Sequence, residues 1–289
     1  MPKTLLDSVL SRILELLPET GELDWMNHPA AVWRQGDWYS RFIGFSQMDE
    51  TGLDDLLNID EQKSKLVTNT EQFLAGLPAN NALLWGARGT GKSTLIHALL
   101  NAYHPEGLRL VEVKKEDLAR LSEIVERLAK YPFKFIVFCD DLSFTVDDPS
   151  YKELKSALEG SIFKTAANVL IYATSNRRHL VPETMADNQR ARMEQGELHE
   201  GEAIEEKISL SDRFGLWLSF YGFKQSAYLN VVAHWVTKFA ERYQVEVDQA
   251  DPELRAEALR WALARGARNG RTAQYFARHW VGQQGLNDR

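Results

Sequence analysis

The sequence has one cysteine among 289 residues, and it has no apolar stretch near the roughly 20 residues that a membrane-spanning helix needs. A single cysteine excludes an internal disulfide framework and fits a reducing compartment. Cys139 lies inside an apolar run, so we expect it to be buried rather than reactive. The formal net charge of −7 indicates no general affinity for nucleic acid, although it allows a local basic patch. We therefore expect a cytoplasmic globular protein without membrane contact.

The first 48 residues differ in pattern from the rest of the chain. In MPKTLLDSVLSRILELL the apolar residues recur at helical spacing, and the acidic Asp7 and Glu15 argue against a secretory leader. We favour an amphipathic helix packed on its own domain, with membrane-surface binding as the alternative. The aromatic stretch AAVWRQGDWYSRFIGF either packs against the next domain, which we favour, or forms a partner surface. Residues 1–48 are thus expected to form an N-terminal helical extension.

Short apolar segments alternate with helical patterns over residues 49–222. We expect strands in NALLW, GLRLVEV, FKFIVFCDD, NVLIYATSN and SLSDRFGLWLSF. We expect helices from Asp60 to about Phe73 and in STLIHALL, KEDLARLSEIVERLAKY and YKELKSALEGSIF. This alternation predicts an α/β core, with a five-stranded parallel sheet flanked by helices.

Two further segments complete the chain. Residues 183–209 are polar and acidic, and we expect a long exposed loop whose role the sequence does not disclose. From Ser226 onward the pattern is helical, so residues 223–289 are expected to form an all-helical tail.

The segment GARGTGKS matches the P-loop pattern G-x-x-x-x-G-K-[ST] at every fixed position. It follows a predicted strand and opens a predicted helix, as the chemistry requires, because backbone N–H groups and the helix N-terminus both attract phosphate oxygens. Lys92 would reach the β- and γ-phosphates of ATP, and the Ser93 hydroxyl would bind Mg²⁺. The residues expected to bind the nucleotide are Gly86, Ala87, Arg88, Gly89, Thr90, Gly91, Lys92, Ser93 and Thr94.

Two adjacent aspartates follow the apolar run IVFC. Such neighbouring charges repel each other unless something offsets them, and a metal ion does so. We expect Asp140 to bind Mg²⁺, directly or through water, and Asp141 to activate the water that attacks the γ-phosphate. The alternative is a helix cap followed by a surface carboxylate. No histidine or cysteine spacing indicates another metal.

Three more residues are candidates for the same reaction. Asn176 ends the predicted strand NVLIYATSN, where it would position the attacking water or close an Asx turn. Arg213 lies in the turn SLSDRFG, where it would reach the γ-phosphate of a neighbouring subunit or pair with Asp212. Arg271 opens the last helix, where it would bind phosphate or simply be solvated.

These motifs, in this order, carry a family resemblance. GARGTGKST, FCDDLSF, IYATSNRRHL, SLSDRFGLWLSF and RNGRTAQYF resemble the AAA+ ATPases. They are most similar to an uncharacterised bacterial family in the domain-of-unknown-function series, number 815. The resemblance covers about residues 53–276, and the first fifty residues match less well. It implies a P-loop NTPase of AAA+ type in which an inserted strand separates the P-loop and Walker B strands, followed by a small helical lid.

The resemblance also assigns roles. It implies that Asn176 is the sensor-1 residue and that Arg213 is the arginine finger, since SLSDRFG is similar to the DRFG turn of branch-migration motors. It suggests Arg271 as sensor 2, with Arg268 close enough to compete. Members commonly form rings or spirals, often hexamers. Most Walker B motifs end in Asp-Glu, whereas Asp141 is one methylene shorter, which leaves the rate of hydrolysis open.

Our leading hypothesis is an Mg²⁺-dependent ATPase whose hydrolysis needs self-association and is coupled to remodelling or loading of a macromolecular client. The second is a nucleotide-gated scaffold with weak hydrolysis. A third, a small-molecule kinase, is disfavoured because no acceptor pocket is identifiable in the sequence. No DNA-reading motif is present, so both protein and DNA clients stay open.

Overall fold

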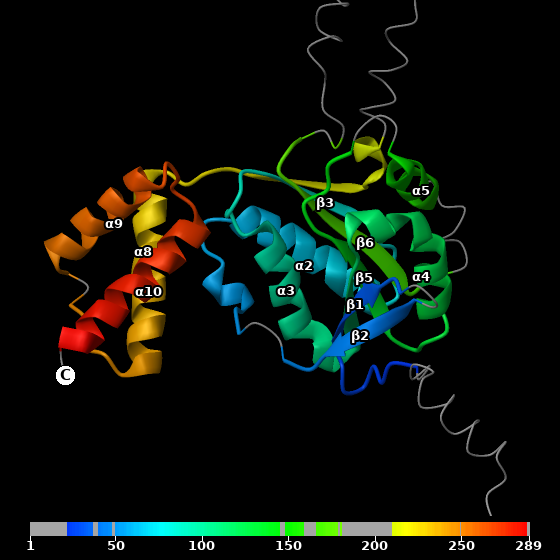
Figure 1. The fold of residues 1–289 in the computed structure, drawn as a ribbon, viewed down its shortest axis with the longest axis horizontal. Helices are drawn as coiled ribbons and strands as arrows, with labels where there is room; N and C mark the ends of the chain where they lie inside the picture. Colours follow the sequence, from blue (N-terminus) through cyan, green and yellow to red (C-terminus); the bar gives the residue numbers. More distant parts are fainter. Residues whose placement is uncertain are drawn as a thin grey trace, which may run out of the picture.

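The computed structural model describes residues 22–36, 40–47, 50–144, 148–158, 166–178, 180, 210–248 and 250–287. Figure 1 shows a sheet covered by helices and a separate helical bundle. The helix expected within residues 1–17 and the acidic loop expected at 183–209 lie outside the described residues. Among the described residues, no helix is long and apolar enough to cross a bilayer.

The sheet has seven strands in the order β2-β1-β4-β5-β6-β3-β7. All neighbours are parallel except the antiparallel pair β1–β2. The five parallel strands β3 to β7 are those predicted, and β6 lies between the P-loop strand β3 and the aspartate-bearing strand β5. The strand bounds are Ala30–Arg34 (β1), Arg41–Phe45 (β2), Ala82–Gly86 (β3), Leu108–Glu112 (β4), Lys134–Cys139 (β5), Val169–Ser175 (β6) and Leu216–Phe220 (β7).

The expected helical extension over residues 1–48 is wrong for its second half, because the aromatic stretch forms β1 and β2. Along β1, Ala31 and Trp33 are buried while their neighbours are partly exposed, which is the two-residue period of a strand. Trp33 packs edge-on against Phe42 of β2, which confirms the packing prediction for these two aromatic residues, whereas Phe45 is exposed. The Arg109 side chain of β4 donates a 2.6 Å hydrogen bond to the Trp25 carbonyl and so fastens the residues just before β1 to the sheet.

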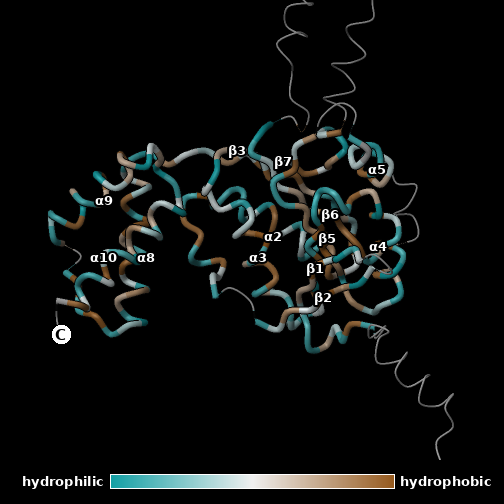
Figure 2. The backbone as a smooth tube through the Cα atoms, viewed as in Figure 1, coloured by the Kyte–Doolittle hydropathy of each residue, from teal (hydrophilic) through white to brown (hydrophobic). Residues whose placement is uncertain are grey.

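Helices cover both faces of the sheet. Residues of α2 (Asp60–Leu74) and α3 (Lys92–Tyr103) share one apolar core with one face of the sheet. Residues of α4 (Leu121–Leu128) and α5 (Pro149–Leu158) share a second core with the other face. Figure 2 shows the hydrophobic segments gathered in these layers. Cys139, at the end of β5, is buried as expected, and burial raises the pKa of its thiol to about 12.

Short 3-10 turns complete the core. They are η1 (Leu53–Asp55), η2 (His104–Glu106), η3 (Lys115–Arg120) and η5 (Ser211–Arg213). The helix predicted in KEDLARLSEIVERLAKY therefore begins as 3-10 and becomes α-helical only at Leu121.

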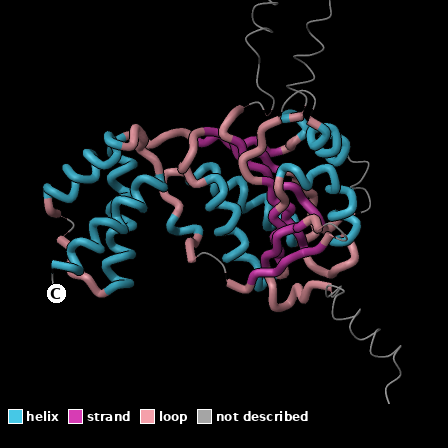
Figure 3. The backbone as a smooth tube through the Cα atoms, viewed as in Figure 1, coloured by secondary structure: helices cyan, strands magenta, loops and turns pink. Residues whose placement is uncertain are grey.

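The segment after β7 is helical, as Figure 3 shows. It consists of α8 (Gln225–Tyr243), α9 (Pro252–Ala264) and α10 (Gly270–Asn287). These helices pack on one another around their own apolar core, which includes Trp235, Phe276 and Trp280. Asp251 caps α9 by accepting a 2.8 Å hydrogen bond from the Glu253 N–H. We call this three-helix unit the lid.

Candidate functional site

The phosphate-binding motif forms the loop between β3 and α3. Its backbone turns sharply, with positive φ angles of 132° at Gly86 and 74° at Gly89. A side chain at Gly86 would also collide with the end of β7, because a Cβ there would lie 1.9 Å from the Phe220 carbonyl oxygen. Glycine therefore meets both a conformational and a steric requirement at this turn.

Lys92, the first residue of α3, points back into the loop. Its ammonium donates to the carbonyls of Gly86 and Ala87 at 2.8 Å each, and to the Asn176 side-chain oxygen at 3.3 Å. The side chain is only 7% exposed. Burial holds the pKa of Lys92 below its ordinary value, while the Asp140 and Asp141 carboxylates act in the opposite direction. Its partners are thus weak carbonyl acceptors, which an anionic ligand could replace.

Asp140 follows β5 and faces the start of α3. The Ser93 hydroxyl donates to its Oδ1 at 2.7 Å, so a hydroxyl and a carboxylate converge on one point. Mg²⁺ is commonly bound by one or two such oxygen ligands together with waters and substrate phosphates. The donor set therefore fits Mg²⁺. The described residues contain no cluster of three or more histidines, cysteines or acidic residues that would indicate a different metal.

Asp141 has a left-handed backbone, with φ at 51°, a conformation that aspartate tolerates better than most residues. The Asn176 side-chain amide donates to its Oδ1. The Arg88 guanidinium lies 3.7 Å from its Oδ2. The structure therefore brings Asp141 and Asn176 together at the edge of the phosphate loop.

Thr174 of β6 connects the two aspartates, although the sequence motifs did not single it out as a site residue. Its buried hydroxyl donates to Asp140 Oδ1 at 2.5 Å and accepts from the Asp141 N–H at 2.9 Å. Its carbonyl also accepts from the Leu142 N–H at 2.7 Å. The sequence feature that could have identified Thr174 is its position: it is a hydroxyl residue two positions before Asn176, on the strand beside β5.

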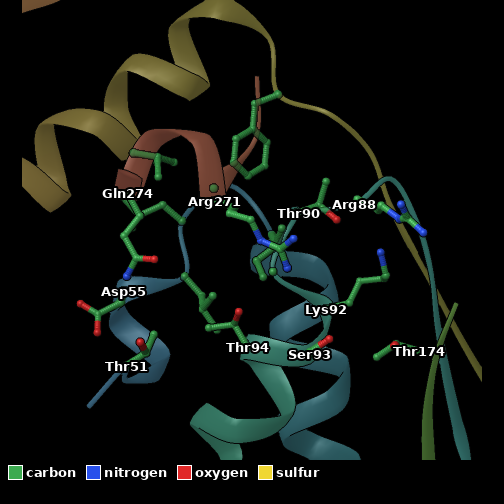
Figure 4. Close-up of a pocket in the computed structure, with 18 of the residues that line it drawn as sticks. Thr51, Asp55, Arg88, Thr90, Lys92, Ser93, Thr94, Thr174, Arg271 and Gln274 are labelled. Atoms are coloured by element: carbon green, nitrogen blue, oxygen red, sulfur yellow. The ribbon is translucent and has the colours of Figure 1, made fainter. Parts of the chain in front are cut away.

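The lid closes the site from the other side. Arg271 lines the cavity, whereas Arg268 does not, and the Arg268 carbonyl instead accepts a 2.8 Å hydrogen bond from the Phe223 N–H. Figure 4 shows the Arg271 side chain extending from the start of α10 toward the phosphate loop. The structure therefore places Arg271, rather than Arg268, beside the loop.

A cavity of about 400 Å³ separates the loop, the strand ends and the lid. Such a volume is typical of small-molecule sites. The polar lining of the cavity includes Lys92, Ser93 and the two aspartates. Its apolar lining consists of Leu56, Leu57, Ile59, Val231, Trp235 and Phe223.

A segment before α2, which we call the strap (residues 50–58), ties the core to the lid. Asp55, only 7% exposed, contacts α8 through His234 Nε2 at 3.0 Å and through the Lys238 ammonium. Glu50 pairs with Arg242 at 2.5 Å, and the Asn58 amide donates to the Ala227 carbonyl at 3.2 Å. The strap therefore holds α8 beside the cavity that it helps to line.

Arg213 is the one predicted site residue that lies elsewhere. It lines a different hollow, together with Lys134 and Gly215. Lys134 begins β5 and Gly215 precedes β7, so this hollow lies at the amino ends of the strands. The phosphate loop and the aspartates follow the carboxyl ends. Within one chain, Arg213 is therefore not part of the cavity.

Two solved structures are similar to this chain. A Thermotoga maritima RuvB mutant superposes with a TM-score of 0.53 at 17% identity, over 82% of this chain and 67% of that one. The Aeropyrum pernix ORC1 protein in complex with DNA gives a TM-score of 0.49 at 15% identity, over 78% of this chain and 62% of that one. The first of these likenesses shows a shared fold.

Two sequence matches complete the comparison. The replication factor C large subunit of Staphylothermus marinus is 39% identical over 77 residues, which are 26% of this chain and only 17% of that protein. The family model described as Protein of unknown function (DUF815) matches residues 26–284. The chain shares the α/β fold of RuvB, and it belongs to the DUF815 family.

Proposed function

We propose that this protein binds ATP with Mg²⁺ and hydrolyses it. The observation that carries the proposal is the convergence of the phosphate loop, the Ser93–Asp140 pair, Asp141 with Asn176, and Arg271 on one cavity. The loop amides and Lys92 would bind the β- and γ-phosphates. Arg271 would contribute a second cationic side chain from the lid, and the apolar side chains of the cavity would hold the base.

Ser93 and Asp140 would bind the metal, which when bound offsets the negative charge of the phosphate oxygens. Asn176 would orient a water against the γ-phosphorus, and Asp141 would accept its proton. The water oxygen then bonds to phosphorus, the bond to the bridging oxygen breaks, and ADP leaves with that electron pair. Asp141 is held by Asn176 and so needs no rearrangement to face the loop.

Self-association is the second part of the proposal. Arg213 lies at the amino ends of the strands, so it would contribute charge only to the cavity of a neighbouring copy. A ring or spiral of copies, such as a hexamer, would provide that geometry. We propose that such an assembly remodels or loads a macromolecular client, of protein or DNA.

The test is a phosphate-release assay across protein concentration with Mg²⁺ and ATP. We expect specific activity to rise with concentration, because assembly completes the site. Asp141→Asn should lower turnover by about 10²–10⁴-fold, the usual contribution of a general base, while leaving ATP binding intact. Phosphate release that is independent of concentration and untouched by Asp141→Asn would instead support a nucleotide-gated scaffold, the alternative favoured by the short side chain of Asp141.

A further inference from the structure

The lid contacts the phosphate loop directly. It donates hydrogen bonds to two successive backbone carbonyls at the tip of the loop. The Asn269 side-chain amide donates to the Arg88 carbonyl at 2.9 Å, across 181 residues of sequence. The Arg271 backbone N–H donates to the Gly89 carbonyl at 3.1 Å. Both donors belong to the segment that opens α10, so one end of one helix holds the loop.

Asn269 forms two kinds of contact at once. Its side-chain oxygen accepts from the Thr272 N–H at 2.8 Å, which caps the first turn of α10. Its side-chain nitrogen donates to the loop. A primary amide has an acceptor and a donor on separate atoms, so the cap fixes the plane of the group and thereby aims the donor.

The absence of a side chain at Gly89 makes room for Asn269. Its φ is 74°, and a Cβ built there would lie 2.8–2.9 Å from the side-chain atoms of Asn269. Real Cβ atoms do not approach other atoms so closely without a shift of one of them. The absence of a side chain at Gly89 therefore lets the lid reach the loop.

The direction of these hydrogen bonds determines where the loop donors point. In a trans peptide the carbonyl and the following N–H lie in one plane and point in opposite directions. Because the Arg88 carbonyl is held by Asn269, the Gly89 N–H points away from that contact. The Gly89 carbonyl is held by the Arg271 N–H in the same way, so the Thr90 N–H also points away from the lid. Backbone N–H groups of such a loop are the ones that bind phosphate oxygens.

We infer that Asn269 is a positioning residue that presets the phosphate loop for its ligand and couples the loop to the lid. The identity of the ligand as a nucleotide rests on the proposed function, whereas the coupling rests on the contacts themselves. Coupling between two sites is reciprocal. Phosphate binding therefore strengthens docking of the lid as much as docking strengthens phosphate binding.

The experiment separates the donor from the cap. Asn269→Ser keeps a capping oxygen but lacks the amide that reaches the loop, and Asn269→Ala lacks both. Both variants should bind ATP and ADP about 3- to 10-fold more weakly in magnesium-free titrations, the size expected for one hydrogen bond. Asn269→Ala should also lower the thermal unfolding midpoint further than Asn269→Ser does, because it loses the cap of α10 as well. Asp251→Ala, which removes the cap of α9, is the matched control and should lower that midpoint without weakening binding.

The inference is overturned if Asn269→Ser binds both nucleotides like the wild type, because Asn269 would then be a helix cap only. A second measurement needs no ligand. Hydrogen exchange in peptides covering residues 86–93 should be faster in both Asn269 variants and unchanged in Asp251→Ala. Should the wild type bind no ATP, the proposed function fails, and exchange decides alone: unchanged exchange in the loop would refute the coupling.

Discussion

At the scale of single residues, Thr174 is the side chain whose hydroxyl contacts both aspartates of the site. Two carboxylates on consecutive residues repel each other, and the backbone between them must turn within one residue. The Thr174 hydroxyl satisfies both needs, since it donates to Asp140 and accepts from the N–H of Asp141. It thereby fixes the Asp140 oxygen that also accepts from Ser93.

We predict that Thr174→Val raises the Mg²⁺ concentration needed for half-maximal ATP hydrolysis. Valine has the same shape but cannot hold the Asp140 carboxylate, and it loses the part-buried hydrogen bond from the Asp141 N–H, worth about 0.5–1.5 kcal/mol of stability. Magnesium-free ATP binding should change little, because the phosphate loop is untouched. A Mg²⁺ titration of phosphate release measures this.

Thr174→Ser is the control for that variant. It retains the hydroxyl and should restore the wild-type Mg²⁺ dependence. A Thr174→Val protein with unaltered Mg²⁺ dependence would show that the hydroxyl does not position Asp140.

At the scale of elements, the strap and α8 form a contact whose strength depends on pH. Burial would raise the pKa of Asp55, but hydrogen bonds from Lys238, from the Gly52 N–H and from His234 outweigh it and hold the pKa below its ordinary 3.8. The unfolded chain therefore takes up the proton more readily than the folded one. The stability from Asp55 is complete above 3.8 and is lost as the pH falls through the lower folded value.

We predict that Asp55→Asn lowers the free energy of unfolding by about 1.5–3 kcal/mol at neutral pH, the usual loss of hydrogen bonds to a charged group. The difference from wild type should shrink as the pH falls below 3.8 and through the lower pKa of the native carboxyl. Denaturant titrations at several pH values measure it.

Glu50→Gln is the matched control on the same strap. The Glu50 and Arg242 side chains are 70% and 52% exposed, so their pair should contribute only about 0–1 kcal/mol. An Asp55→Asn effect that stays constant from neutral to acid pH would contradict the proposed charge contact.

At the scale of the whole molecule, the cavity and Arg213 lie at opposite ends of the parallel strands. One chain cannot bring them together without rebuilding the sheet. If Arg213 contributes to hydrolysis, it must therefore do so in a second copy.

We predict that two inactive variants restore activity when mixed. Lys92→Ala retains Arg213 but has a defective phosphate loop, whereas Arg213→Ala retains the loop. In a mixed assembly, some Arg213→Ala subunits, whose phosphate loop is intact, lie next to a Lys92→Ala subunit that supplies an intact Arg213. Phosphate release by the mixture should therefore exceed the sum of the separate activities. Steady-state assays of the mixture measure this.

Mixing Lys92→Ala with Asp141→Asn is the control, because both changes damage the same cavity and no subunit supplies an intact one. If the first mixture were as inactive as the control, Arg213 would not act between subunits.

The sequence by itself determined the parallel core, the phosphate loop and the acidic strand end. Each of them is encoded by a run of consecutive residues whose local properties are enough to predict its structure. GARGTGKS encodes its turns through glycine, and β5 is an apolar run that ends in two charges. The strands were readable because buried parallel strands are nearly continuous apolar runs. The placement of Asp140 near Ser93 follows from the convergence of parallel strand ends.

Only the tertiary structure decided how distant segments meet. The stretch around Trp33 joined the sheet because its alternating side chains find a core, an outcome that depends on β4 beside it. Thr174, Asn269 and Asp55 gain their roles from partners 33 to 183 residues away. Sequence spacing does not specify such contacts, since packing of whole elements determines them. The same packing placed Arg271 in the cavity and Arg213 outside it.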